Sequence, residues 1–428
     1  MEELLTRVEL ENGLKVVLKE IHSAPIISHW LWYQVGSRYE KPGLTGVSHW
    51  VEHMLFKGTP NFPAGILDKA ISRDGGYWNA FTFLDWTTFF ETVPAGKVDL
   101  PIALEADRMV NSLFDIEEVS SERTVIISER EGSENEPLFL LDEAIQAAAF
   151  EQHPYRNEII GSKADLLSIT RDDLYNHYRD YYSPGNAVLA LAGDFNSTEM
   201  LEKIKQTYQK LPGSKVKQLG LQREAPLKTE KRVEVYGPGE TTYLVIAWRA
   251  PEAAADDFFS FTIADSLLTG PSSLNMFGGG GVSNKTSRLY RRLVEREFAI
   301  SVNGSLQATY DPYLYSITIT VNPRRTPEEV LHEVDEEFDT FFQSAVKQTE
   351  IDRAAKQARA LFAYGSENIT NQAFWLGYSE MFADYSWFTQ YTNRLAAVTP
   401  EVLLKTIREN MMPEQRVVGI YRPDGEQA

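Results

Sequence analysis

The stretch His49-Trp50-Val51-Glu52-His53 lies within residues 46–57, where the apolar side chains recur with helical spacing. Thr45 precedes this segment and is predicted to be the N-cap of a helix of about three turns. Gly58 follows the segment and is a typical residue for the end of a helix. The sequence therefore predicts one short helix that contains both histidines.

On this helix His49 and His53 are one turn apart and face the same side. Two imidazoles at this spacing can bind one zinc ion, and Glu52 can reach the open side of the metal. The order His-x-x-Glu-His is the reverse of the commoner His-Glu-x-x-His. The alternative is an ordinary helix with two surface histidines, because zinc also needs a third protein ligand from elsewhere in the chain.

Residues 116–134 are predicted to form a long, acidic helix that could supply this ligand. Glu122 and Glu129 are two helical turns apart and share a face. A carboxylate on the apolar face of this helix is costly unless it is paired or bound to a metal. The candidates for the third zinc ligand are Glu117, Glu118, Glu122, Glu129, Glu131 and Glu134. We expect most of these side chains to lie on a solvated surface.

The composition is that of a folded globular protein, with 43% hydrophobic and 12% aromatic residues in 428. The chain has no cysteine, so only histidine and carboxylate side chains remain as strong metal ligands. The net charge of −19 argues against a nucleic-acid surface and favours cationic partners. A solvated acidic surface is the alternative explanation of this charge.

No apolar run approaches the roughly 18 residues of a membrane span. The acidic residues 1–7 lack the apolar core of a signal peptide. We therefore expect a soluble protein with the cytoplasm as its compartment, unless an organelle targeting peptide was removed before residue 1.

Strand and helix patterns alternate along the chain and predict an α+β protein. The pair Asn12-Gly13 between two apolar runs predicts a hairpin with a type I′ turn. We expect a first α/β domain over residues 1–212, a linker over 213–231 and a second domain over 232–428. Each domain should contain an antiparallel-rich sheet packed with helices, and the two should form a clamshell.

The second half of the chain repeats the pattern of the first. Pro94 and Pro323 lie 229 positions apart, as do Pro184 and Pro413. A constant offset indicates two copies of one unit. Carried across by this shift, Glu52 falls on Gly281 and Glu129 falls on Ala358. The second copy should therefore lack a metal site and contain a glycine run, residues 278–281, in place of the zinc helix.

These motifs together resemble the pitrilysin family of zinc peptidases. The resemblance rests on His49-x-x-Glu52-His53 followed 76 residues later by Glu129. It covers essentially the whole chain and is strongest to the small two-domain members, which include the β subunit of the mitochondrial processing peptidase. The supporting blocks are His53-Met54-Leu55-Phe56-Lys57-Gly58-Thr59, Gly75-Gly76-Tyr77-Trp78-Asn79-Ala80 and Thr87-Thr88-Phe89-Phe90.

The resemblance implies one zinc ion per chain with His49, His53 and Glu129 as its ligands. It implies that Glu52 is the general base and that Glu122 orients a ligand, although Glu122 could instead balance a nearby arginine. It also implies that substrate peptides bind by strand addition to an edge strand at residues 76–82. The substrate-binding residues of this strand would be Gly76, Asn79, Ala80, Phe81 and Thr82. The alternative for Asn79 is that it only forms a turn.

One feature of the family is missing. Single-chain and homodimeric relatives have an Arg and a Tyr seven positions apart near the substrate. The matching positions here hold Leu293 and Ile300, and the neighbouring arginines are out of register. We therefore expect a heterodimer with a homologous subunit that has the Arg/Tyr pair, or else a homodimer. The glycine run 278–281 resembles a loop of the processing peptidase's non-catalytic partner, with a flexible linker as the alternative.

The resemblance predicts a zinc metalloendopeptidase. Its substrates would be unfolded or presequence-like peptides, which it would hydrolyse inside a closed chamber. The acidic charge near the site would favour basic peptides. The alternative is a weakly active or structural core subunit of a larger complex, as some family members are. The complete set of His49, Glu52, His53 and Glu129 argues against that alternative, and a single site with a base argues against metal storage.

Overall fold

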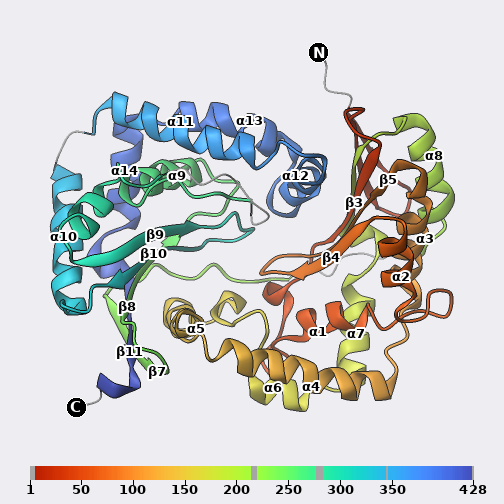
Figure 1. Cartoon of the computed structure of the whole chain (residues 1–428), viewed down its shortest axis with the longest axis horizontal. Helices are drawn as coiled ribbons and strands as arrows, with labels where there is room; N and C mark the ends of the chain where they lie inside the picture. The colour runs from red at the N-terminus through yellow and green to blue at the C-terminus, as the bar shows by residue number, and fades with distance from the viewer. Residues whose placement is uncertain (1–4, 214–218, 276–282, 344–345, 427–428) are drawn as a thin grey trace. The chain divides into compact units, whose positions relative to one another are not determined.

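The computed structural model describes residues 5–213, 219–275, 283–343 and 346–426. The chain forms two compact units, each built around one sheet (Figure 1). The first unit contains residues 1–130, 157–221 and 366–385, and the second contains residues 131–156, 222–365 and 386–428. The boundary at Leu221/Gln222 lies within the segment predicted to be a linker.

Within the described residues, the sheet of the first unit has six strands in the order β1-β2-β6-β3-β5-β4. Strands β2 and β6 are parallel and the other neighbours are antiparallel. A hairpin joins the first two strands as predicted, but its turn is not of the predicted type I′. That type needs a positive φ at both Asn12 and Gly13, and only Gly13 has one, of 90°. The strands are β1 (Leu5–Glu9), β2 (Lys15–Glu20), β3 (Ile26–Tyr33), β4 (Tyr77–Thr82), β5 (Thr87–Pro94) and β6 (Ala187–Gly193).

The helices of this unit pack on the sheet and on one another. Helix α1 packs against α7 and against strands β4 and β5, which places it at the edge of the sheet. The helices are α1 (Val47–Met54), α2 (Ile66–Arg73), α3 (Asp99–Asn111), α4 (Ile116–Ser133), α6 (Lys163–Ser168), α7 (Arg171–Tyr181), α8 (Ser197–Tyr208) and α12 (Ile369–Phe382). The last three residues of α4 are counted with the second unit.

The sheet of the second unit has five described strands in the order β7-β11-β8-β10-β9. Strands β7 and β11 are parallel and the other neighbours are antiparallel. The strands are β7 (Lys231–Gly237), β8 (Tyr243–Ala250), β9 (Ala299–Leu306), β10 (Tyr313–Val321) and β11 (Arg416–Pro423). The helices are α5 (Pro137–Ala149), α9 (Asp257–Leu268), α10 (Pro327–Gln343), α11 (Gln348–Tyr364), α13 (Tyr385–Ala396) and α14 (Pro400–Asn410).

The two sheets share one topology, which confirms the predicted fold class of two homologous, antiparallel-rich α/β domains. The order β2-β6-β3-β5-β4 of the first corresponds to β7-β11-β8-β10-β9 of the second. Strands β6 and β11 begin 229 positions apart, whereas β3 and β8 begin 217 apart, because the loops between equivalent strands differ in length.

The projection of Glu52 onto Gly281 was therefore wrong. Helix α9 follows β8 as α1 follows β3, so α9 is the equivalent of the predicted zinc helix. Helix α9 contains no histidine. The glycine run 278–281 lies outside the described residues.

The two halves of the chain exchange one helix. Helix α5, from the first half, packs on β7, β8 and β11, and α12, from the second half, packs on β3 and β6 (Figure 1). The close approach on the first sheet requires a glycine, because a Cβ at Gly377 would lie 2.2 Å from the Trp32 ring. On the second sheet, a Cβ at Gly419 would lie 2.6 Å from Ile145. Each sheet is thus completed by a helix from the other half of the sequence.

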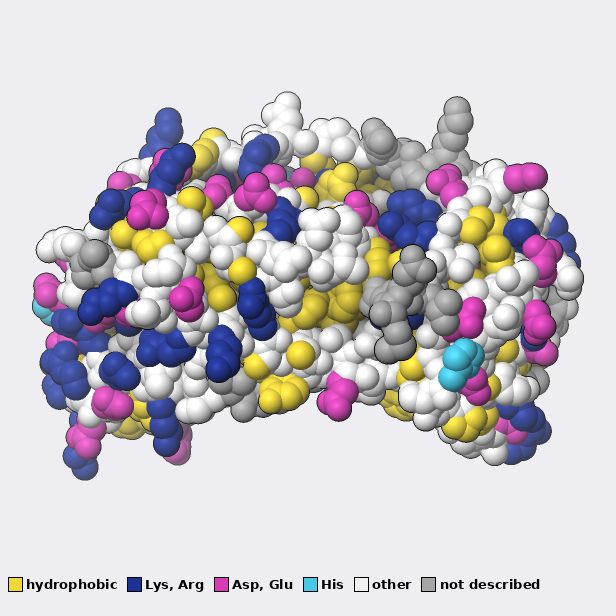
Figure 2. Space-filling view, turned by 90° about the horizontal axis from the view of Figure 1, so that it is seen from above, with side chains coloured by type: hydrophobic (Ala, Val, Ile, Leu, Met, Phe, Trp, Pro, Cys, Tyr) yellow, Lys and Arg dark blue, Asp and Glu magenta, His cyan; other side chains and the backbone are white. Residues whose placement is uncertain are grey.

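The surface shows mixed charge. On the face in Figure 2, acidic and basic side chains are interspersed, so the net charge of −19 does not form one continuous acidic field there. Among the described helices, none combines the length and the apolar character that crossing a membrane requires.

Candidate metal centre

A buried carboxylate holds the start of α1. Glu40 accepts hydrogen bonds from the backbone N–H groups of Gly46, at 2.8 Å, and Ser48, at 2.9 Å. Gly46, with a φ of 88°, occupies the N-cap position, so the prediction of Thr45 as N-cap was wrong. The Thr45 hydroxyl instead donates to Asp165 over 2.6 Å. Glu40 lies too far back in the sequence for a local capping pattern to reveal it.

Helix α1 buries its apolar face and presents both histidines on the other side. Trp50, Val51 and Met54 are fully buried, whereas the side chains of His49 and His53 are 14% and 21% exposed. Burial and the neighbouring His53 lower the pKa of His49 to about 3, so its ring is neutral at physiological pH. A neutral imidazole is the form that binds metals.

The structure brings His49, His53 and Glu129 together. The two Nε2 atoms lie 3.2 Å apart, and Glu129 Oε2 lies 4.0 Å from His49 Nε2 and 3.7 Å from His53 Nε2. Two ligands of a tetrahedral zinc ion lie about 3.4 Å apart, given bonds of about 2.0–2.1 Å. The three atoms therefore fit one zinc ion with small side-chain movements, and they are the one cluster of this kind among the described residues.

Glu122 fixes the orientation of His53. The His53 Nδ1–H group donates to Glu122 Oε1 over 2.8 Å, and Nε2 lies 3.7 Å from Glu129 Oε2. Burial would raise the pKa of Glu122, but hydrogen bonds from Lys57 and His53 hold it below its usual value. The cation that balances Glu122 is Lys57, and the nearby Arg123 stacks over Trp50 instead.

Glu52 lies beside this cluster and is held by the sheet. The Thr82 hydroxyl donates to Glu52 Oε2 over 2.7 Å, and the carboxylate is 93% buried. Burial raises the pKa of Glu52 to about 7, while the hydrogen bond from Thr82 acts in the opposite direction. The other oxygen, Oε1, receives no hydrogen bond from a described residue.

The predicted substrate strand is β4, which is the edge strand of the first sheet. Ala80 is buried, Phe81 and Thr82 are half-buried, and the Asn79 Oδ1 atom accepts a hydrogen bond from the Ala80 N–H over 2.9 Å. Gly76 precedes the strand and packs so closely on Ile71 that a Cβ would lie 2.6 Å from its side chain. Thr82 is the predicted substrate residue that contacts the glutamate at the metal cluster.

The remaining acidic candidates on α4 do not join the cluster. Glu118 lies 3.8 Å from Lys57 and is half-exposed, and Glu117 is exposed at the start of the helix. Neither belongs to the group of atoms that could hold a metal.

Sequence reasoning missed a second group of buried charges behind the sheet. His29 Nδ1 and Glu91 Oε2 are hydrogen-bonded over 2.9 Å, and Arg108 lies 3.1 Å from Glu105 Oε1. Burial lowers the pKa of His29 to about 4 and raises that of Glu91 to about 7. The signal that could have revealed it is the pair Glu105 and Arg108, three positions apart on the buried face of α3.

At the two positions where the family resemblance led us to look for an Arg/Tyr pair, this chain has apolar side chains. Leu293 is fully buried in a π-helical turn, Tyr290–Val294. Ile300 is 57% exposed on β9, the edge strand of the second sheet. Neither side chain can donate a hydrogen bond.

Known protein families and individual proteins resemble this chain. A profile described as "Insulinase (Peptidase family M16)" matches residues 15–163, and one described as "Peptidase M16 inactive domain" matches residues 168–358. An uncharacterized zinc protease of Streptomyces coelicolor is 27% identical over 426 residues, which cover 96% of this chain and 89% of that protein.

One further relative matches about half of the chain, and one solved structure matches nearly all of it. A probable mitochondrial-processing peptidase subunit beta of Arabidopsis thaliana is 33% identical over 207 residues, 48% of this chain and 39% of that protein. The crystal structure of a protease from Helicobacter pylori has the same fold, with a TM-score of 0.90 and 24% identity, and covers 98% of this chain and 100% of that one. Since its two halves match the two domains of one family in order, the chain belongs to peptidase family M16, the pitrilysin family.

Proposed function

We propose that this chain is a zinc metalloendopeptidase that hydrolyses unfolded or presequence-like peptides. The observation on which the proposal rests is the convergence of His49, His53 and Glu129 within 4.8 Å, beside a buried glutamate. The names of the relatives, which include several zinc proteases, support the same activity. His49, His53 and Glu129 would hold the ion, and Glu122 would fix the ring of His53.

When bound, zinc would supply a Lewis acid with an open fourth position. The residues of the chain would perform the proton transfers. Glu52 Oε1 would take a proton from the water that attacks the peptide carbonyl and pass it to the leaving amine nitrogen. Thr82 would hold Oε2, so that the carboxylate keeps one orientation throughout.

The substrate would be an extended peptide that adds to the free edge of β4. Edge strands bind peptides through main-chain hydrogen bonds, which makes binding tolerant of sequence and requires an unfolded segment. Because Thr82 lies at the end of β4 and contacts Glu52, a peptide on this edge would pass the glutamate. The acidic residues Glu117 and Glu118 nearby support a preference for basic peptides.

We further propose that the chain is the catalytic subunit of a heterodimer, with a homodimer as the alternative. The apolar Leu293 and Ile300 support this, because an oxyanion formed in the reaction needs donors that these positions lack. A homologous subunit with the Arg/Tyr pair would supply them.

The metal assignment can be tested by metal analysis. The wild-type chain should bind one zinc per chain and cleave members of a peptide library. His49→Ala combined with His53→Ala should lose both, while His22→Ala combined with His332→Ala, which removes two histidines outside the cluster, should lose neither. Stoichiometric zinc in the first variant would refute the ligand set. A zinc-loaded wild-type chain without hydrolysis, alone or with a homologous subunit, would favour the structural role.

A further inference from the structure

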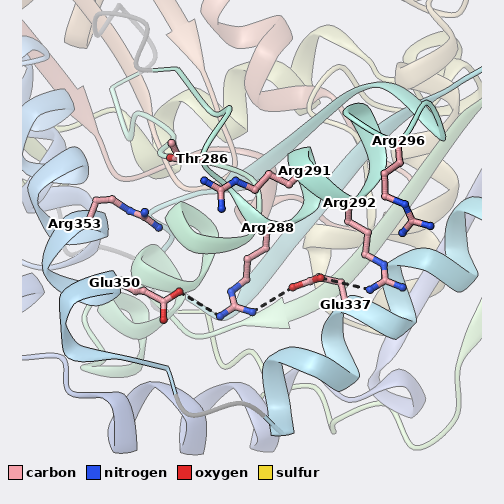
Figure 3. A pocket seen from close by; sticks show the side chains of 8 residues that line it. All are labelled: Thr286, Arg288, Arg291, Arg292, Arg296, Glu337, Glu350 and Arg353. Atoms are coloured by element: carbon pink, nitrogen blue, oxygen red, sulfur yellow. Dashed lines mark hydrogen bonds and ion pairs between the residues drawn. The ribbon is translucent and has the colours of Figure 1, made fainter.

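A basic pocket lies in the second unit, among residues that the proposed peptidase activity does not use. The cavity has a volume of about 460 Å³ and is lined by five arginines, two glutamates and one threonine (Figure 3). The chain as a whole has 61 acidic against 42 basic residues, so a pocket with more arginines than carboxylates departs from its average. The lining residues are Thr286, Arg288, Arg291, Arg292, Arg296, Glu337, Glu350 and Arg353.

Four of the arginines come from one segment of unusual backbone. Residues 290–294 form a π-helical turn, in which the Glu295 N–H donates to the Tyr290 carbonyl. Three residues after this turn, Glu297 has a φ of 58°. Wider helical turns of this kind are frequent at functional sites, because they change which side chains share a face. Here the arginines of this segment line one cavity, opposite residues from α10 and α11.

Three of the five lining arginines are paired with glutamates. Arg288 lies 3.3 Å from Glu337 and 3.4 Å from Glu350, and Arg292 lies 2.8 Å from Glu333. Arg296 pairs with Glu333 over 2.7 Å. These pairs neutralise the three arginines without a ligand.

Arg291 and Arg353 differ from these three. Neither side chain makes a hydrogen bond or an ion pair with another described residue. Their guanidinium groups approach each other from opposite sides of the pocket in Figure 3, and Thr286 lies next to them. Two like charges held in one pocket repel each other unless an anion lies between them. Although the chain has an excess of carboxylates, no described carboxylate pairs with Arg291 or Arg353. An external anion could therefore bind between them.

We propose that Arg291 and Arg353 bind a small phosphoryl dianion. Two guanidinium groups match the two negative charges of a phosphate at neutral pH, and each can donate two parallel hydrogen bonds to it. The Thr286 hydroxyl provides a further donor. A single carboxylate would neutralise only one of the two arginines. The polar and charged lining does not offer the apolar surface that binds most larger organic ligands.

Binding of phosphate can be measured directly and without the peptidase reaction. Isothermal titration of the metal-free protein with inorganic phosphate, at constant ionic strength, avoids competition for zinc. A second titration with phosphoserine distinguishes a phosphoryl group on a larger molecule from the free anion, according to which of the two binds more tightly. Acetate serves as the singly charged control and should bind at least about tenfold more weakly.

The variants separate a specific site from general charge. Arg291→Gln and Arg353→Gln should each weaken phosphate binding by about tenfold or more, and the double variant should lose it. Arg324→Gln combined with Lys405→Gln removes the same charge from exposed positions of the same unit and should bind as the wild type does. All variants should keep the wild-type melting temperature, because Arg291 and Arg353 form no described ion pair. Equal phosphate binding by the wild type and the double variant, or equal loss in the control, would overturn the proposal.

Discussion

The hydroxyl of Thr82, at the end of edge strand β4, donates a hydrogen bond to Oε2 of Glu52 over 2.7 Å. This contact connects the strand on which a peptide would lie with the glutamate that would move its protons. It also holds one of the two carboxylate oxygens in place. The position of Glu52 thus depends on the sheet as well as on its own helix.

Removal of this hydroxyl should impair turnover more than metal binding. Thr82→Val keeps the shape of the side chain and loses the donor, so we expect kcat to fall by about tenfold, since a hydrogen bond to a charged group contributes about 1.5–3 kcal/mol. Zinc content should not change. Thr82→Ser keeps the donor and should retain most of the activity. A Thr82→Val variant with wild-type kcat would show that Glu52 needs no such support.

Glu122 should act on the metal through His53. Because it holds the Nδ1–H group of that ring, Glu122→Ala should weaken zinc affinity by about 10–100-fold, as measured by competition with a chelator. Glu118→Ala, four positions earlier on the same helix, is the matched control and should leave the affinity unchanged. Equal zinc affinity in the two variants would mean that the contact at 2.8 Å does not orient the ligand.

The buried Glu91 should make stability depend on pH. Its pKa is raised from about 4.5 in an unfolded chain to about 7 by burial, so the folded chain retains a proton that the unfolded chain releases. The stability from this group is fully present below pH 4.5 and is lost as the pH rises through 7. Glu91→Gln should therefore reduce the fall of the unfolding free energy over this range, by up to about 1.4 kcal/mol per pH unit.

Chemical denaturation of the metal-free protein at a series of pH values measures this effect. His29, with its lowered pKa, acts in the opposite sense, since its stability is present above pH 6.5 and is lost as the pH falls towards 4. Because Glu91 and His29 are hydrogen-bonded to each other, the difference between wild type and Glu91→Gln measures the contribution of this pair. Parallel curves for the two proteins would contradict the shifted pKa of Glu91.

The proposed partner should raise turnover and not zinc affinity. If Leu293 and Ile300 leave the oxyanion without donors, the isolated chain should be a poor catalyst, because loss of one such donor costs about 2.7–4 kcal/mol. Peptide hydrolysis by the purified chain, before and after addition of a homologous subunit from its native source, measures this. A full rate for the isolated chain, with no homologous subunit in a co-purification, would favour a homodimer.

The sequence predicted those features that depend on local spacing. His49 and His53 lie on one face because four positions make about one helical turn. The hairpin between the first two strands forms where Gly13 provides a positive φ, although not with the predicted type I′ turn. Glu129 could not be chosen from spacing among the acidic residues of α4, and the family resemblance supplied it. The roles of the three as zinc ligands stay predictions.

Features that depend on distant packing were not predictable. The apolar side chains of α5 and α12 indicate that each helix must bury one face. They do not indicate that each helix covers the sheet formed by the other half of the chain. The cap from Glu40 and the contact from Thr82 join segments that no local pattern connects. The prediction that Glu52 corresponds to Gly281 was wrong because it assumed loops of equal length in the two copies. The loops differ in length.

Glu52→Gln tests the central claim most directly. The amide has nearly the same shape but cannot accept a proton from water, and the three proposed ligands remain. Zinc content and peptide hydrolysis should be measured on the same sample, with Glu199→Gln, on α8, as the control for loss of one exposed charge. The account predicts one zinc per chain and hydrolysis lowered by about two or more orders of magnitude in Glu52→Gln, with normal values in the control. Wild-type turnover in the zinc-loaded Glu52→Gln variant would contradict it.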